Sequence, residues 1–181
     1  MKTKYIKRCS NEFIRKEIIE RLLQVDRDMA LIDTSDDVYT CVIAGGSALV
    51  LMKKIYRSTH DIDSIDASDE IKQLLELYNI NMNVNAYRIN FPENYLERIV
   101  KVNIPTKKVN FYTLSLEDLV VSKLCAMRGK DIEDIENELV YNSLDWDLLD
   151  RLVDDVCYGM LTDFDKNILL EHYKDYKERF K

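Results

Sequence analysis

The feature that most constrains the fold of this chain is a pair of adjacent glycines between two apolar segments. Gly45 and Gly46 are two of only four glycines in 181 residues. They follow an apolar run at residues 38–44, predicted to be a buried strand, and precede a short helix predicted over residues 47–56. Glycine lets the backbone approach a ligand, and the helix N–H groups with the Ser47 hydroxyl would suit a phosphate. Taken alone, the pattern is more often a simple tight turn.

Two carboxylates follow this turn. Asp61 comes 14 residues after Ser47, and Ile62 separates it from Asp63. On a strand, residues i and i+2 point to the same side, so the two carboxylates share a face while Ile62 faces the core. Hard oxygen ligands of this kind suit Mg²⁺ or Mn²⁺ bound together with substrate phosphates. Taken alone, D-x-D is most often a solvated strand face.

Together, the two patterns resemble the signature of the nucleotidyltransferase superfamily, in which a glycine–serine turn and a helix precede D-h-D (h is apolar). Residues 57–63, R-S-T-H-D-I-D, resemble the R-x-T-x-D-I-D stretch of the branch that includes AbiEii-type toxins and related bacterial families. Residues 114–124 and 128–135 are similar to the L-S-x-E-D-L…K-L…R-x-K-D-x-x-D block of those families. The resemblance covers residues 40–135. It implies an α+β nucleotidyltransferase fold, a small mixed β-sheet flanked by helices, with a helical C-terminal part.

The resemblance also implies a metal-dependent transfer of a nucleotidyl group from an NTP to an RNA, protein or small-molecule acceptor. The residues expected to bind the nucleotide are Gly45, Gly46, Ser47, Arg57, Arg128 and Lys130. The residues expected to act in catalysis are Asp61, Asp63, Lys123, Asp131 and Asp134, and Asp61 and Asp63 are also the expected metal ligands. On a helix, Lys123 can direct its ammonium at the triphosphate, while Asp131 and Asp134 share a face and can orient Lys123 or the acceptor. Each of these charges alone is more often a solvated residue at a helix end.

One departure from the family pattern concerns a third acid. Many nucleotidyltransferases carry it on a later core strand, whereas the strands predicted over residues 81–89 and 108–112 contain asparagine, Asn110 among them, and no acid. An asparagine carbonyl can bind a cation but brings no charge. Three other acids could take that place: Asp66, Asp131 and Asp134. Otherwise two carboxylates suffice, or the chain is a catalytically degenerate binding protein with the same fold.

The rest of the chain alternates predicted helices with one predicted hairpin. Helices are expected over residues 11–29 (capped by Ser10 or Asn11), 68–78 (capped by Ser68), 115–128 (capped by Ser115), 131–141, 145–157 and 162–177. A hairpin is expected from residues 96–104 and 108–112. We therefore divide the chain into an α/β core, residues 1–113, and a helical part, residues 114–181, packed on that core.

Composition limits the classes of function and location. The formal net charge of -7 argues against a protein that coats nucleic acid through its phosphates. The four cysteines form no C-x-x-C pair and are expected to be reduced thiols. No export signal or membrane span is apparent, so we expect a cytoplasmic protein. The expected partners are an NTP, an RNA acceptor and, if the chain is the toxin of a toxin–antitoxin pair, an antitoxin protein. A less favoured hypothesis is an interaction protein whose C-terminal helices form an interface.

Overall fold

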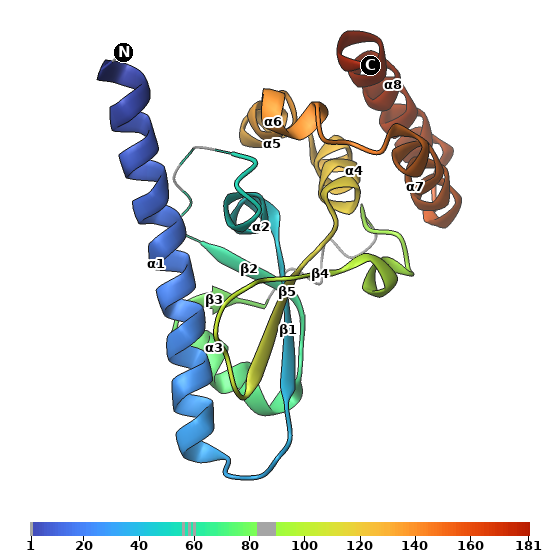
Figure 1. Ribbon diagram of the computed structural model, residues 1–181. Helices are drawn as coiled ribbons and strands as arrows, with labels where there is room; N and C mark the ends of the chain where they lie inside the picture. The colour runs from blue at the N-terminus through green and yellow to red at the C-terminus, as the bar shows by residue number, and fades with distance from the viewer. Residues whose placement is uncertain (1, 56, 58, 60, 83–89) are drawn as a thin grey trace. The chain divides into compact units, whose positions relative to one another are not determined.

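The computed structural model describes residues 2–55, 57, 59, 61–82 and 90–181 (Figure 1). Contacts within the chain divide it into two units. The first comprises Met1–Asn85 and Ile99–Leu114 and holds the β-sheet. The second comprises Ala86–Arg98 and Ser115–Lys181 and is mainly helical. The segment Ala86–Arg98, which the sequence analysis placed in the first part, is thus grouped with the helical unit.

The first unit is built on a five-stranded sheet in the order β3-β2-β1-β5-β4. Its strands are β1 (Tyr39–Ala44), β2 (Ile62–Ala67), β3 (Ile80–Asn81), β4 (Val100–Lys101) and β5 (Val109–Thr113). The central strand β1 pairs antiparallel with β2 and parallel with β5, while β3 is parallel to β2 and β4 is antiparallel to β5. The predicted mixed sheet is therefore confirmed. Of the strand predicted over residues 81–89, residues 83–89 lie outside the described part of the chain.

A long helix, α1 (Lys2–Ile32), packs one face against this unit, where it contacts α2, α3 and β5. Its buried side chains recur at helical spacing: Ile18, Leu22, Val25 and Met29. The prediction that Ser10 or Asn11 caps the helix is wrong, because the helix runs through both residues. Residues 2–10 contain no glycine or proline that would interrupt it.

Asp26 joins α1 to the start of β5. Its side chain is buried, and its carboxylate accepts hydrogen bonds from the backbone N–H groups of Lys107, Lys108 and Val109 at 2.7 to 3.1 Å. Without this acceptor, N–H groups would be buried unpaired where the helix meets the strand. Asp26 therefore fixes the position of α1 along the sheet.

Two short helices connect the first strands. α2 (Gly45–Leu51) begins at the glycine pair rather than after it, and α3 (Lys72–Leu77) follows the 3-10 turn η1 (Asp69–Ile71). Ser68 lies at the start of η1, as predicted, but its side chain makes no capping bond there. Its Oγ instead accepts the backbone N–H of Thr40 at 3.0 Å, which joins this turn to β1.

The strand predicted over residues 96–104 is wrong for most of its length. A 3-10 helix, η3 (Tyr95–Arg98), precedes the short strand β4. Backbone hydrogen bonds to the carbonyls of Pro92 and Asn94 turn the chain into η3, and a strand cannot include these bonds. The predicted pairing with the next strand is confirmed, because β4 is antiparallel to β5.

The described residues of the second unit form α4 (Leu116–Ala126), α5 (Gly129–Ile135), α6 (Glu138–Tyr141), α7 (Trp146–Gly159) and α8 (Asp163–Phe180). α4 contacts α5, α7 and α8, and α7 lies beside α8 (Figure 1). The predicted cap at Ser115 is confirmed, since its Oγ accepts the Asp118 N–H at 3.0 Å. The helix predicted over residues 131–141 is instead α5 and α6, because the Asn137 side chain caps α6. Among the described helices, none has the length and apolar character needed to cross a bilayer.

Candidate functional site

The glycine turn and the carboxylate pair, far apart in the sequence, meet in the first unit. Gly45 adopts a φ of +62°, which glycine accepts far more readily than other residues. A Cβ added to Gly45 would lie 2.8 Å from Oδ2 of Asp63. Glycine is therefore favoured at this position for two reasons: its backbone has a positive φ, and the Asp63 carboxylate leaves no room for a Cβ.

The second glycine of the turn lies beside a cation. A Cβ added to Gly46 would be 2.8 Å from one terminal nitrogen of the Arg57 guanidinium and 3.4 Å from its Cζ. The Arg57 side chain is partly exposed. The start of α2 is thus flanked by a carboxylate at Gly45 and by a guanidinium at Gly46, a pairing suited to a metal-bound phosphate.

Of the two carboxylates, only Asp63 lies within a strand, because β2 begins at Ile62 and Asp61 precedes it. Ile62 is only 1% exposed, whereas Asp61 is exposed and Asp63 is partly exposed. Asp63 is in register with Ala44 of β1 on one side and with Asn81 of β3 on the other. The carboxylates therefore lie beside the end of β1 from which the glycine turn begins.

Asn81 occupies the position next to Asp63 on a later strand. Its Nδ2 donates to Oδ1 of Asp63 at 3.2 Å. Asn110, the other asparagine considered, pairs with Thr40, four residues before Ala44 on β1. At roughly 3.3 Å per residue this separation is about 13 Å, so Asn110 lies outside the site. The polar neighbour that the carboxylates acquire is Asn81.

Asp66 reaches the same sheet face as Asp63 through a β-bulge. Asp63 pairs with Ala44 and Asp66 pairs with Val42, so Ile65 is an extra residue on β2. Simple alternation would have placed the two acids on opposite faces. Nevertheless, the described residues contain no group of three or more His, Cys, Asp or Glu side chains that could hold a metal.

Ser47 does not present its hydroxyl as expected. The side chain is fully buried in the first turn of α2, and its Oγ donates to the carbonyl of Ala44 at 2.9 Å. The hydroxyl thus closes the strand–helix turn. The expected donation to a phosphate is not supported by this arrangement.

The second motif forms a buried ion-pair network in the helical unit. Lys123 Nζ lies 2.9 Å from Oδ1 of Asp131 and 2.8 Å from Oδ2 of Asp134. The Lys123 side chain is only 6% exposed, and those of the two acids are 5% and 1% exposed. The expectation that Asp131 and Asp134 orient Lys123 agrees with this geometry. The expectation that its ammonium points at a triphosphate does not, because two carboxylates already surround it.

The two basic residues next to this network are more accessible. Arg128 Nε donates to Oδ2 of Asp131 at 2.7 Å, yet 68% of the Arg128 side chain is exposed, and Lys130 is exposed as well. Burial by itself would raise the pKa of the Asp131 carboxyl, but hydrogen bonds from Arg128 and Lys123 outweigh it and hold this pKa below its ordinary value. Asp131 is therefore a stable anion between two cations.

Sequence reasoning missed the partners of the first half of this motif. Asp118 is fully buried and binds the Arg98 guanidinium through both oxygens, at 2.9 and 3.1 Å. The neighbouring Glu117 accepts the backbone N–H of Asp145 at the start of α7. The E-D pair of the motif thus joins α4 to η3 and to α7. No sequence pattern pointed to Arg98, so its contact with Asp118 was not predicted.

A family model described as "Nucleotidyltransferase of unknown function (DUF6036)" matches residues 20–181. The match includes both motifs and all helices of the second unit. It bears out the resemblance to the nucleotidyltransferase superfamily and the predicted fold, but it does not address the AbiEii-type branch. No curated protein and no solved structure is significantly similar to the chain.

Proposed function

Because the chain belongs to this family of nucleotidyltransferases of unknown function, we propose that it transfers a nucleotidyl group from an NTP to an RNA, protein or small-molecule acceptor. An acceptor hydroxyl releases its proton to solvent as its oxygen bonds to the α-phosphorus, the bond from that phosphorus to the α–β bridging oxygen breaks, and pyrophosphate leaves. The contact of Asp63 with the Gly45 turn carries the proposal, because it brings together the two parts of the site.

The donor set fits a hard divalent cation. Asp61 and Asp63 supply carboxylate oxygens, and the Nδ2 of Asn81 donates to Oδ1 of Asp63 and so helps to orient that carboxylate. A Mg²⁺ or Mn²⁺ ion held there would neutralise triphosphate charge and lower the pKa of the acceptor hydroxyl. Arg57, beside Gly46, is placed to pair with a phosphate oxygen, and the glycine backbone leaves room for the phosphate chain.

The helical unit contributes differently from the first expectation. We propose that Lys123, Asp131 and Asp134 hold α4 to α5 and thereby position the exposed cations Arg128 and Lys130. Arg128 and Lys130 are exposed to solvent, whereas the ammonium of Lys123 is buried and enclosed by acids.

The test is transfer of label from each α-³²P-NTP, with Mg²⁺ or Mn²⁺, to total RNA, to protein or to small-molecule acceptors. We expect transfer by the wild-type chain and loss of at least about a hundredfold in Asp63→Asn, because the metal site loses a charge. Glu70→Gln is the matched control, since Glu70 is an exposed acid in η1, the 3-10 turn that follows β2. Absence of transfer with every nucleotide and acceptor, or equal activity of Asp63→Asn and wild type, would refute the proposal.

The resemblance to AbiEii-type proteins supports a narrower proposal: a cytoplasmic toxin that modifies RNA and is restrained by an antitoxin. Induced expression should then arrest growth in the wild type and not in Asp63→Asn, with both chains present at equal levels. Identical growth arrest in the two strains would show that any toxicity does not depend on nucleotidyl transfer, and would contradict this narrower proposal.

One observation favours a second candidate, a degenerate protein that binds a nucleotide without chemistry. Asn81 is the neighbour of Asp63 on the adjoining strand, where a third acid would add charge to a metal site. Calorimetry with ATP, GTP, CTP and UTP distinguishes the two candidates. Metal-independent binding without turnover supports the degenerate protein, and Mg²⁺-dependent binding with turnover supports the enzyme.

A further inference from the structure

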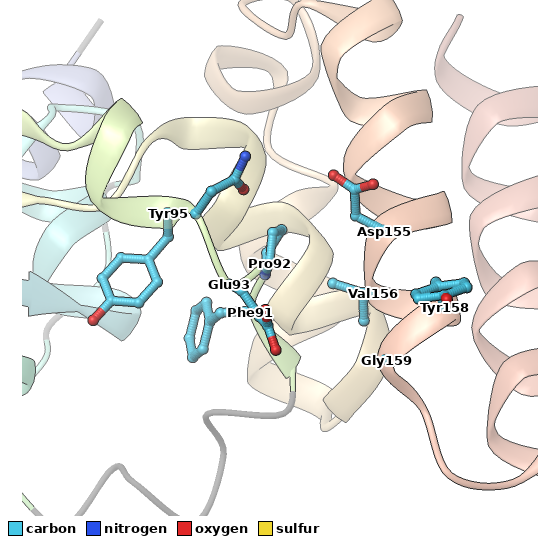
Figure 2. Close-up of a pocket in the computed structure, with 9 residues that line it drawn as sticks. Phe91, Pro92, Glu93, Tyr95, Asp155, Val156, Tyr158 and Gly159 are labelled. Atoms are coloured by element: carbon cyan, nitrogen blue, oxygen red, sulfur yellow. The ribbon is translucent and has the colours of Figure 1, made fainter.

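The described lining of a hollow in the helical unit includes none of the residues assigned above to nucleotide or metal binding. It has a volume of about 890 Å³ and is formed by residues 91–95, which lead into η3, and by the last turns of α7. Its apolar lining includes Phe91, Pro92 and Val156, and Figure 2 shows Val156 directed from α7 toward Pro92. The exposed acids Glu93 and Asp155 also line it. The hollow therefore combines an apolar interior with acidic groups at its opening.

The segment from the last turn of α7 to the first turn of α8 carries three exposed apolar side chains. Tyr158 is 92% exposed, Leu161 90% and Phe164 73%. A single exposed apolar side chain is ordinary, whereas three within seven residues concentrate apolar surface at the end of α7 and the start of α8. Tyr158 also lines the hollow, so it joins the hollow to this segment as one surface. We call it the α7–α8 surface, and it consists of Phe91, Glu93, Asp155, Tyr158, Leu161 and Phe164.

The charges around this surface are predominantly negative. Its exposed acidic neighbours are Glu93, Asp154, Asp155, Asp163 and Asp165. Lys166, on the first turns of α8, has its Nζ 3.6 Å from Asp163 and so offsets part of this charge. Exposed apolar side chains beside a hollow, with charge of one sign around them, are typical of a protein interface whose partner carries the opposite sign.

We propose that the α7–α8 surface docks a basic, amphipathic segment of a partner protein. The apolar face of the segment packs on Tyr158, Leu161 and Phe164 and inserts a side chain into the hollow. Its lysines and arginines pair with the acidic rim. Charge complementarity selects this occupant over a second copy of the chain, which carries a net charge of -7. The proposal does not depend on nucleotidyl transfer.

The test uses the full chain and fluorescence anisotropy of labelled 16-residue peptides. The probe peptide has leucines on one helical face and lysines and arginines on the other. A shuffled peptide of identical composition removes the amphipathic pattern, and a third peptide replaces every basic residue with glutamate. We expect the probe peptide to bind at least about tenfold more tightly than both, and to weaken as salt rises from about 50 to 300 mM.

Surface variants then locate the binding. Tyr158→Ser combined with Phe164→Ser, and separately Glu93→Lys combined with Asp155→Lys, should each weaken binding at least about tenfold. Asp36→Lys combined with Glu70→Lys changes the net charge by the same amount at exposed residues of the first unit and should leave binding unchanged. All substituted groups except Asp36 and Glu70 belong to the α7–α8 surface, and unchanged circular dichroism melting of each variant shows that the fold is kept.

Three results would overturn the proposal. Equal binding of the probe and shuffled peptides would indicate general attraction to an acidic protein. An equal loss of peptide binding in the control that combines Asp36→Lys with Glu70→Lys would also indicate general attraction to an acidic protein. A wild-type dimer in light scattering that Tyr158→Ser converts to a monomer would show that a second copy covers this surface.

Discussion

Substitution of Lys123 separates a structural role from a substrate-binding role for the second motif. In Lys123→Met, the side chain keeps a similar length, but the ammonium between Asp131 and Asp134 is lost. Both carboxylates then remain buried, with side chains 5% and 1% exposed. Asp131 keeps the hydrogen bond from Arg128 at 2.7 Å, whereas Asp134 loses its hydrogen bond from Lys123.

The size of the effect follows from the two contacts. Each hydrogen bond to a charged group contributes about 1.5–3 kcal/mol, and removing one partner of a buried ion pair costs about 3–5 kcal/mol. We therefore expect Lys123→Met to lower the free energy of unfolding of the helical unit by about 3–5 kcal/mol. Adding Asp131→Asn and Asp134→Asn to the same chain removes the two carboxylate charges that Lys123 paired and should recover more than about half of this loss.

The assay is urea unfolding followed by the fluorescence of Trp146. It is the single tryptophan of the chain and packs against Tyr176 within the helical unit, with ring centroids 5.8 Å apart. The matched control is Lys130→Met, at an exposed lysine, for which a change within about 0.5 kcal/mol is expected. If Lys123→Met costs less than about 1 kcal/mol but abolishes nucleotidyl transfer, the buried network is not structural and the ammonium serves the substrate.

Three further predictions follow from other contacts. Gly45→Ala should cost about 1–3 kcal/mol in urea unfolding and also reduce nucleotidyl transfer, because its φ is +62° and its Cβ would lie 2.8 Å from Asp63; an unchanged midpoint would contradict this. Asp26→Ala should cost about 2–4 kcal/mol, because three backbone N–H groups lose a charged acceptor, whereas Glu70→Ala as an exposed control should change little; equal effects of the two would argue against the role of Asp26. The lowered pKa of Asp131 means that its charged form contributes stability above the ordinary aspartate pKa of about 3.9, and that this contribution is lost as pH falls through the lower folded-state pKa. Acid titrations of stability should therefore show a shallower loss below about pH 4 in Asp131→Asn than in the wild type, and identical curves would refute the assignment.

Much of the local structure could be predicted from the sequence because its signals act over a few residues. The apolar run before Gly45 predicts β1, and a serine three residues before Asp118 predicts the cap of α4. Alternation along Asp61, Ile62 and Asp63 predicts which side chains face the core. In each case the relevant residues are neighbours in the chain, so their spacing is enough to predict the local structure.

The contacts that define the site depend on residues far apart in the chain. Asp63 lies against Gly45, and Asn81 rather than Asn110 is its neighbour, because strand order and register decide which side chains meet. The bulge at Ile65, which turns Asp66 to the face of Asp63, has no local signal that we recognised.

By itself, the sequence determined the family, the strand–glycine–helix turn and the burial of Ile62 between two more exposed acids. Only the tertiary structure decided that Lys123 is enclosed by two acids rather than open to a triphosphate. The physical reason is that a charged residue has the same helical spacing whether it faces solvent or the interior. Its surroundings are set by the helices that pack over it, and here packing buries Lys123 with Asp131 and Asp134.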